Sequence, residues 1–305
     1  MNKNYFTGTL MCLTAVVFWG GMFPVMAPAL KIIDPFYFTL LRYGTVAVLL
    51  AVILFFVEGR SAFKLEGHLL MLWLLGTSAF AGFSFLVFLG QKLAGNSGSV
   101  IASVMMAVQP LLAVLVAWAW KRQKPTKFAF VCMLAALVGV VLVVTKGDFS
   151  VLFSAASPTI LILLGALCWV IYSTGIGSFP DWSILRYSTI TTILGMISVI
   201  VILLAATLSG WLSFPTMSQV SHIPFALLYM IIPAGIIALF TWNLGNRQLT
   251  TLNGILFMNL VPITAFIING FLGYKFGMFE IFGAVIVVAA LVSNNLYNRS
   301  VQKIS

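Results

Sequence analysis

The side chains that could hold a small molecule in this chain are aromatic or uncharged and polar. Trp19 and Trp169 fall near the middle of two apolar runs, and Gln109 lies inside another. An indole N–H or an amide removed from water favours a hydrogen-bonding partner. We therefore predict a cavity for an uncharged or zwitterionic amphipathic ligand, lined by Trp19, Phe23, Ser84, Ser103, Gln109, Trp169, Tyr172, Trp242 and Asn243. The alternative for each residue is ordinary packing or hydrogen bonding between helices.

Catalytic and metal chemistry is not predicted. Acid–base or metal catalysis needs clustered His, Asp, Glu or Cys side chains. The 6 acidic residues lie outside the apolar runs or at their edges, both histidines flank such runs, and the 3 cysteines lack metal-ligand and disulfide spacing. A nucleotide-binding P-loop is also missing from the sequence. We expect no enzyme, no cofactor, no metal, and no membrane carboxylate at which protons and cationic substrates compete.

Membrane-spanning helices must position these side chains. The chain has 305 residues, of which 62% are hydrophobic and only 7% charged, so lipid is the expected surrounding of most of it. A span needs about 20 apolar residues. The sequence predicts an all-α, multi-pass protein of the cytoplasmic membrane with ten spans, at residues 5–30, 35–57, 69–90, 98–120, 127–145, 158–179, 184–208, 224–243, 251–273 and 278–297.

The positive charges indicate how the spans are oriented. The net charge is +10, and the cations stand at the ends of the apolar runs. Most of them fall on the side that would hold both termini, above all in KRQKPTK at residues 121–127. An excess of Lys and Arg marks the cytoplasmic side, so both termini are predicted to be cytoplasmic. The positive charge is therefore not interpreted as a sign of nucleic-acid binding, and membrane lipid is the expected partner.

The two halves of the chain resemble each other. FWG at residues 18–20 matches CWV at 168–170, and QPLLAVLVAW at 109–118 matches VPITAFIING at 261–270. Five spans in each half force the second half to enter the membrane in the opposite orientation. We predict two inverted five-helix repeats, residues 1–150 and 151–305, within one membrane domain, an arrangement typical of secondary transporters.

Flexible points and flanking charges suggest gates. Two glycines and two prolines in the first span, and one proline in each of the fourth and ninth, predict bending or close helix approach. These candidates are Gly20, Gly21, Pro24, Pro28, Pro110 and Pro262. Arg42, Arg186 and Arg247 flank spans. The first two are expected to pair with Asp34 and Asp181 or to snorkel, and gate contacts or capture of a carboxylate are the alternatives.

These motifs together resemble the drug/metabolite transporter superfamily, and within it the ten-helix EamA type. The resemblance rests on FWG in the first span, an Asp…Arg start of the second, QP and NLVP in the fourth and ninth, and small residues in the tenth. It implies export of amino acids or related metabolites. One departure is the lack of the glycine–glutamate pair that relatives often carry after the fourth and ninth spans. Here those places read AWKRQK and LGYKFG.

The favoured function is a secondary transporter that exports a small amphipathic metabolite by alternating access around a central cavity. An importer of a vitamin or similar nutrient with the same fold remains an alternative, as does a receptor or assembly factor that transports nothing. Small residues at helical spacing in the fifth and tenth spans permit close packing inside a monomer or at a homodimer face.

Overall fold

The computed structural model describes residues 3–106, 108–121, 126–148, 152–249, 254 and 256–302. These described residues form helices, turns and loops without a strand. Three features predicted from the sequence fall wholly or partly outside them: the boundary between the halves at residues 150 and 151, most of the KRQKPTK loop, and the start of the ninth span.

Helices occupy all ten predicted ranges where the chain is described. The first half holds α1 (Lys3–Ala29), α2 (Pro35–Glu58), α3 (Leu69–Gly76), the π-helical η2 (Thr77–Phe83), α4 (Ser84–Leu93), α5 (Gly98–Met106), α6 (Gln109–Lys121) and α7 (Lys127–Thr145). The second half holds α8 (Leu152–Gly175), α9 (Ile184–Leu208), α10 (Met217–Ser221), α11 (Pro224–Ile231), the π-helical η6 (Ile232–Ile237), α12 (Ala238–Leu249), η7 (Leu256–Asn259), α14 (Leu260–Phe271) and α15 (Met278–Gln302). Single-turn 3₁₀ segments are η1 (Arg60–Phe63), η3 (Gly95–Ser97) and η5 (Ile176–Ser178).

The lengths of these helices confirm a multi-pass membrane protein. Among the described residues, six helices are long and apolar enough to cross a membrane, and a seventh span results if α5 and α6, bent by 46°, count as one. Shorter apolar helices occupy residues 130–143, 260–271 and 278–290. The figure of ten complete spans therefore stays a prediction.

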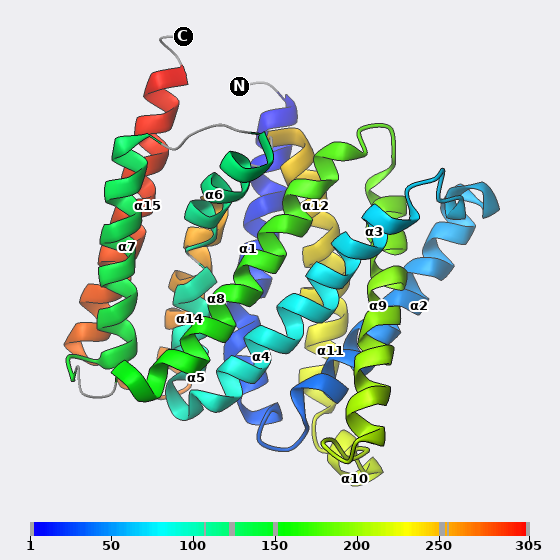
Figure 1. Ribbon diagram of the computed structural model, residues 1–305, viewed down its shortest axis with the longest axis horizontal. Helices are drawn as coiled ribbons and strands as arrows, with labels where there is room; N and C mark the ends of the chain where they lie inside the picture. Colours follow the sequence, from blue (N-terminus) through cyan, green and yellow to red (C-terminus); the bar gives the residue numbers. More distant parts are fainter. Residues whose placement is uncertain are drawn as a thin grey trace.

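The helices pack across the two halves of the chain. α1 lies against α12 and α14, whereas α8 lies against α4, α5 and α6. α2 packs on α9, and α7 packs on α15 at one side of the molecule. α1 begins and α15 ends at the same edge, the upper one in Figure 1.

Two π-helical segments interrupt the third and eighth predicted spans. A π segment shifts the hydrogen-bond pattern by one residue and leaves one carbonyl without its usual partner. In the second half, the N–H of Ala238 donates to the carbonyl of Pro233, although an α-helix would direct it to Ala234. The carbonyl oxygen of Ala234 is thus open to side-chain donors.

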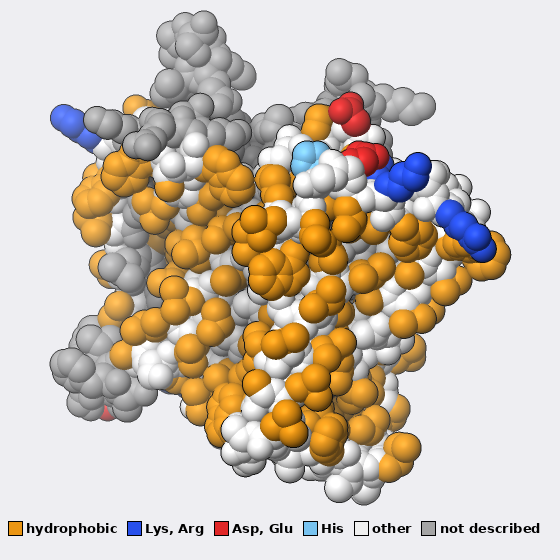
Figure 2. All heavy atoms as spheres, turned by 45° about the vertical axis from the view of Figure 1, so that its right-hand side comes forward, with side chains coloured by type: hydrophobic (Ala, Val, Ile, Leu, Met, Phe, Trp, Pro, Cys, Tyr) orange, Lys and Arg blue, Asp and Glu red, His pale blue; other side chains and the backbone are white. Residues whose placement is uncertain are grey.

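Apolar side chains cover the outside of the bundle. On α2, Val48, Val52 and Phe56 are exposed, and on α9 the same holds for Ile197 and Val201. Figure 2 shows this face, with hydrophobic side chains over its height and the charged ones gathered mainly at its upper edge. This distribution suits a lipid surrounding, in which exposed apolar groups cost nothing.

Helices α7 and α15 approach closely at a pair of glycines. A Cβ atom added to Gly139 would lie 2.6 Å from the carbonyl oxygen of Gly283 and 2.8 Å from Val287. Backbone cannot move aside as a flexible side chain can. The contact therefore requires glycine, and these two glycines serve packing within the chain.

Gly139→Ala should lower thermal stability because the added methyl group forces α7 and α15 apart, at a cost of about 1–3 kcal/mol. The matched control is Gly44→Ala in α2, where the nearest atom to an added Cβ is Met196 Cε at 4.0 Å. The unfolding temperature in detergent measures both. Equal temperatures for the two variants would contradict the described packing of α7 on α15.

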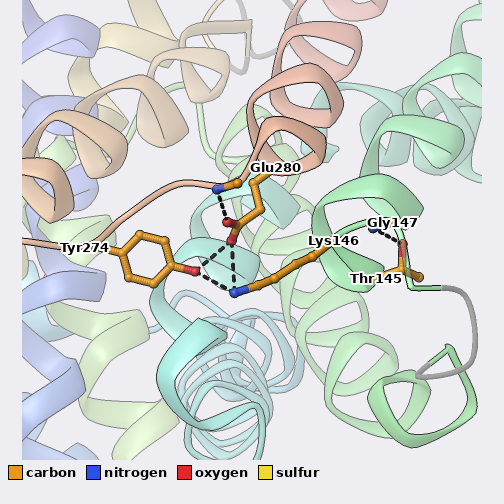
Figure 3. Close-up of polar contacts among 6 residues, drawn as sticks. Thr145, Lys146, Gly147, Tyr274 and Glu280 are labelled. Atoms are coloured by element: carbon orange, nitrogen blue, oxygen red, sulfur yellow. Dashed lines mark hydrogen bonds and ion pairs between the residues drawn. The ribbon is translucent and has the colours of Figure 1, made fainter.

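A polar cluster joins the lower ends of α7 and α15. Figure 3 shows Lys146, Tyr274 and Glu280 pointing toward one another. Lys146 Nζ donates to Tyr274 Oη at 2.9 Å, and Tyr274 Oη donates to Glu280 Oε1 at 2.7 Å. The second carboxylate oxygen of Glu280 accepts the N–H of Gly277 at 2.8 Å, at the start of α15. The buried carboxylate thus fixes both the loop before α15 and the end of α7.

Stability should fall in alkali as this cluster loses its charge. Burial alone would lower the pKa of Lys146, but the hydrogen bond to Tyr274 and the charge of Glu280 outweigh it and raise the pKa above the ordinary 10.5. A raised folded-state pKa gives stabilisation that is complete below the unfolded value and is lost as the pH rises through the folded one. Thermal melts of wild type and Lys146→Gln should therefore stay apart up to about pH 10.5 and approach each other only above it. Curves that stay parallel would refute the role of this charge.

Candidate functional site

Three tryptophans meet in the centre of the bundle. The rings of Trp19 on α1 and Trp169 on α8 lie edge to face, with centroids 5.1 Å apart. The ring of Trp242 on α12 lies 5.2 Å from that of Trp19 on another side. The paired positions predicted in the two halves are therefore in direct contact.

Trp19 is fixed by the π segment of the eighth predicted span. Its Nε1 donates to the carbonyl oxygen of Ala234 at 3.0 Å. This is the oxygen that the π-helical hydrogen bond of Pro233 leaves open. The interruption of the helix thus creates the acceptor that orients the indole of Trp19.

A small cavity of about 20 Å³ lies beside the tryptophan pair. It is lined by Trp19, Met22, Phe23, Arg42, Tyr43, Phe83, Met106, Gln109, Trp169, Met258 and Val261. We call it the tryptophan cavity. This volume holds about one water molecule and is far below the roughly 300–1,000 Å³ of small-molecule pockets, so a larger ligand requires the surrounding helices to move apart.

Arg42 is part of this cavity, which corrects its expected place at a membrane edge. Its side chain is fully buried, and its Nε and Nη2 donate to the carbonyl oxygens of Met230 at 2.9 Å and Ala234 at 3.3 Å. The predicted partner Asp34 instead caps α2 through the N–H of Phe36 and lies 3.6 Å from Lys92. Snorkelling and pairing with Asp34 are therefore both wrong for Arg42.

Two other polar groups on the cavity wall have an atom without a hydrogen-bond partner. Trp169 is 3% exposed, and its Nε1 makes no hydrogen bond. Gln109 is 1% exposed; its amide nitrogen lies 3.1 Å from the sulfur of Met106, and its Oε1 makes no bond. A buried donor or acceptor left unpaired costs about 1–3 kcal/mol. Such atoms in a cavity are what a ligand would satisfy.

Of the nine predicted binding residues, Trp19, Phe23, Gln109 and Trp169 line the cavity. The rest lie among buried side chains outside its wall: Ser84, Ser103, Tyr172, Trp242 and Asn243. Asn243 Nδ2 donates to the hydroxyl of Tyr172 at 2.9 Å, and Trp242 Nε1 donates to Ser173 Oγ at 3.0 Å. These contacts form a second layer that supports the tryptophans.

The glycines of the first span serve close contact in this structure. α1 is one helix from Lys3 to Ala29, with Pro24 and Pro28 inside it. A Cβ atom at Gly20 would collide with Thr264 of α14, and one at Gly21 would collide with the hydroxyl of Tyr229 of α11. That hydroxyl donates to the carbonyl of Phe18 at 2.8 Å. Both glycines therefore admit neighbouring helices against α1.

The prolines of the fourth and ninth spans fall in first turns of helices. Pro110 is the second residue of α6, next to the 46° bend between α5 and α6. Pro262 is the third residue of α14, after the 3₁₀ turn η7. Proline is tolerated there because the first N–H groups have no partner inside the helix.

Arg186 and Arg247 both contact Trp182 at one end of the bundle. Arg186 donates to Glu66 Oε1 at 2.7 Å and stacks 3.7 Å from the ring centre of Trp182. Its pairing with Asp181 was therefore the wrong expectation. Arg247 donates to the carbonyl oxygens of Trp182 and of Phe179, the latter at 3.1 Å. The hydrogen bonds from Arg186 and Trp182 hold the pKa of Glu66 below its usual value.

Several wall residues were missed by sequence reasoning. Met22, Tyr43, Phe83, Met106, Met258 and Val261 are apolar or aromatic residues of kinds that fill any membrane helix. Arg42 did carry a signal. It lies four residues after Phe38 and four before Val46, and both are completely buried. A helix places such residues on one face, which here is the inner one. In the described residues no group of three or more His, Cys, Asp or Glu could hold a metal ion.

Comparison with known proteins agrees with this architecture. The sequence pattern of the EamA-like transporter family matches residues 6–145. The uncharacterized transporter YrdR of Bacillus subtilis (strain 168) is 40% identical over 297 residues, which are 96% of this chain and 92% of that protein. The uncharacterized transporter YyaM of the same organism is 27% identical over 291 residues, covering 93% of this chain and 92% of that protein.

A solved crystal structure shares the fold. It superposes with a TM-score of 0.66 at 19% sequence identity, over 96% of this chain and 98% of that one. The apolar helices and the transporter relatives together establish a multi-pass membrane transporter. On the identity to YrdR over almost the full length, the chain belongs to the EamA-like transporter family.

Proposed function

We propose that this protein is a secondary transporter that exports amino acids or related small amphipathic metabolites across the cytoplasmic membrane. The observation that carries the proposal is the tryptophan cavity, whose wall comes from both halves of the chain and includes the Trp19–Trp169 contact at 5.1 Å. Its aromatic lining and its few polar groups suit a ligand with an apolar body and a polar end. The resemblance to the drug/metabolite transporter superfamily, which implies export of amino acids or related metabolites, is the ground for the substrate class.

The proposed architecture is two inverted repeats. In such repeats α1 corresponds to α8, α12 to α4 and α14 to α6. The contacts of α1 with α12 and α14 then correspond to those of α8 with α4 and α6. α2 with α9, and α7 with α15, are pairs that exchange of corresponding helices leaves in place. The two π segments lie in the third span and in the eighth, which are equivalent in the repeats. A pseudo-two-fold axis in the membrane plane accounts for all three observations.

Alternating access follows from this architecture. If the two repeats exchange conformations, the cavity opens first to one side of the membrane and then to the other. Arg186 and Arg247 join the loop residues Glu66 and Trp182 at one mouth, where breaking hydrogen bonds would open a path. The breaks before Pro110 and Pro262 offer points at which α6 and α14 can tilt.

Substitution of Trp169 should weaken substrate binding while the protein still folds. Trp169→Phe keeps an aromatic ring but removes the unpaired N–H. Substrate affinity should therefore fall about 5- to 10-fold, which corresponds to the free energy of one hydrogen bond. Trp169→Ala should abolish transport. A metabolite panel, screened by thermal shift and then by flux in proteoliposomes, supplies the substrate and the readout.

The matched control is Trp73→Phe on α3, a residue that is 38% exposed on the bundle surface. It should leave flux unchanged. If both variants of Trp169 fold and transport like wild type, the tryptophan cavity is not the transport site. If no member of the panel is transported by wild type, the proposed function itself is refuted.

Topology can be tested with single cysteines after replacement of Cys12, Cys132 and Cys168. An impermeant maleimide should label Ser213→Cys on intact cells, since the loop between α9 and α10 is expected outside. Ser61→Cys, between α2 and α3, should react only after permeabilisation. Both positions are exposed in the structure, so the reverse pattern would overturn the predicted orientation.

A further inference from the structure

We infer that Arg42 binds the carboxylate of the transported molecule, so that the tryptophan cavity selects carboxylates over amines of the same shape. The inference deepens the proposed function and rests on it. It begins from the burial of a guanidinium group, 0% exposed, in a cavity wall.

The charge of Arg42 has no anionic partner among the described residues, which include every acidic residue of the chain. Its hydrogen bonds run to the carbonyl oxygens of Met230 and Ala234 and to the sulfur of Met22, at 3.7 Å. The ring of Tyr43 lies 4.2 Å from the guanidinium carbon. All these partners are neutral. A buried cation that lacks an anion is costly, and an entering carboxylate would remove that cost through charge-assisted bonds.

The unpaired atoms on the same wall complement an amino acid. Trp169 Nε1 is a free donor that can share the carboxylate with Arg42. Gln109 Oε1 is a free acceptor that can take an N–H of the ligand. Trp19 and Phe83 also line the cavity, and once the helices part to admit a ligand their aromatic faces can hold an apolar body or face an ammonium group.

The same wall disfavours a ligand whose only charge is an ammonium. No Asp or Glu lines the cavity, so an amine would add a second cation beside Arg42 without compensation. A purely structural Arg42, which only holds the carbonyls of Met230 and Ala234, would make no such distinction. Ligand selectivity therefore separates a binding role from a structural one.

The experiment uses four probes built on one phenylethyl body: L-phenylalanine, 3-phenylpropanoate, phenethylamine and 3-phenylpropanamide. Their dissociation constants are measured calorimetrically on the full-length protein in nanodiscs. In wild type, 3-phenylpropanoate should bind at least roughly 10-fold tighter than its amide, the range of one charge-assisted contact, and phenethylamine should bind weakest. Arg42→Gln should reduce the first ratio to within threefold, and Arg42→Lys should give an intermediate value.

Arg60→Gln, on the exposed η1 turn, is the control and should keep the wild-type ratio. Equal binding of acid, amide and amine to wild type would overturn the inference, even where panel substrates are transported. Failure of all four probes to bind would overturn it as well. Should Arg42→Gln not fold, the wild-type series and Arg42→Lys still decide the outcome, whereas absence of flux for every metabolite refutes the proposed function instead.

Discussion

One backbone oxygen connects the parts of the candidate site. The carbonyl of Ala234, which loses its α-helical partner in the π segment η6, accepts from both Trp19 and Arg42. It thereby ties α1 and α2 of the first half to the eighth predicted span in the second. In a membrane interior no water is at hand to satisfy such an oxygen, so the two side chains are held there firmly. The orientation of the indole and the depth of the guanidinium both follow from this contact.

The rest of the site is arranged around that contact. Trp169 packs against Trp19, and Tyr172 packs 5.2 Å behind Trp169. The hydroxyl of Tyr172 accepts a hydrogen bond from Asn243 Nδ2, which also donates to Ser188 Oγ at 2.9 Å. Some polar atoms away from the cavity also lack a hydrogen-bond partner, among them Asn243 Oδ1 and both amide atoms of Asn246. The unpaired atoms on the cavity wall itself are Trp169 Nε1 and Gln109 Oε1.

Much of this could be predicted from the sequence. Helices in the predicted ranges follow from hydropathy, and the contact between Trp19 and Trp169 follows the similarity of the two halves. The predicted position of Arg42 at a membrane edge was wrong because Asp34 with Arg42 was matched to Asp181 with Arg186 by residue type alone. The helices show that Arg186 lies in the first turn of α9, whereas Arg42 lies two turns into α2. The π segments were not predicted. Pro233 in η6 is a residue type that interrupts helices, but η2 contains no proline, and tertiary partners such as Trp19 decide whether an open carbonyl is tolerated.

The two halves of the chain differ at the position of the buried charge of Arg42. Arg42 is the eighth residue of α2, and the eighth residue of α9 is Thr191, whose hydroxyl donates back to the carbonyl of Tyr187. If the two halves form the proposed inverted repeats, the mainly apolar tryptophan cavity between them carries its positive charge on one half only. A molecule with one charged end would keep the same heading relative to the membrane during passage, and would cross by translation without turning end over end.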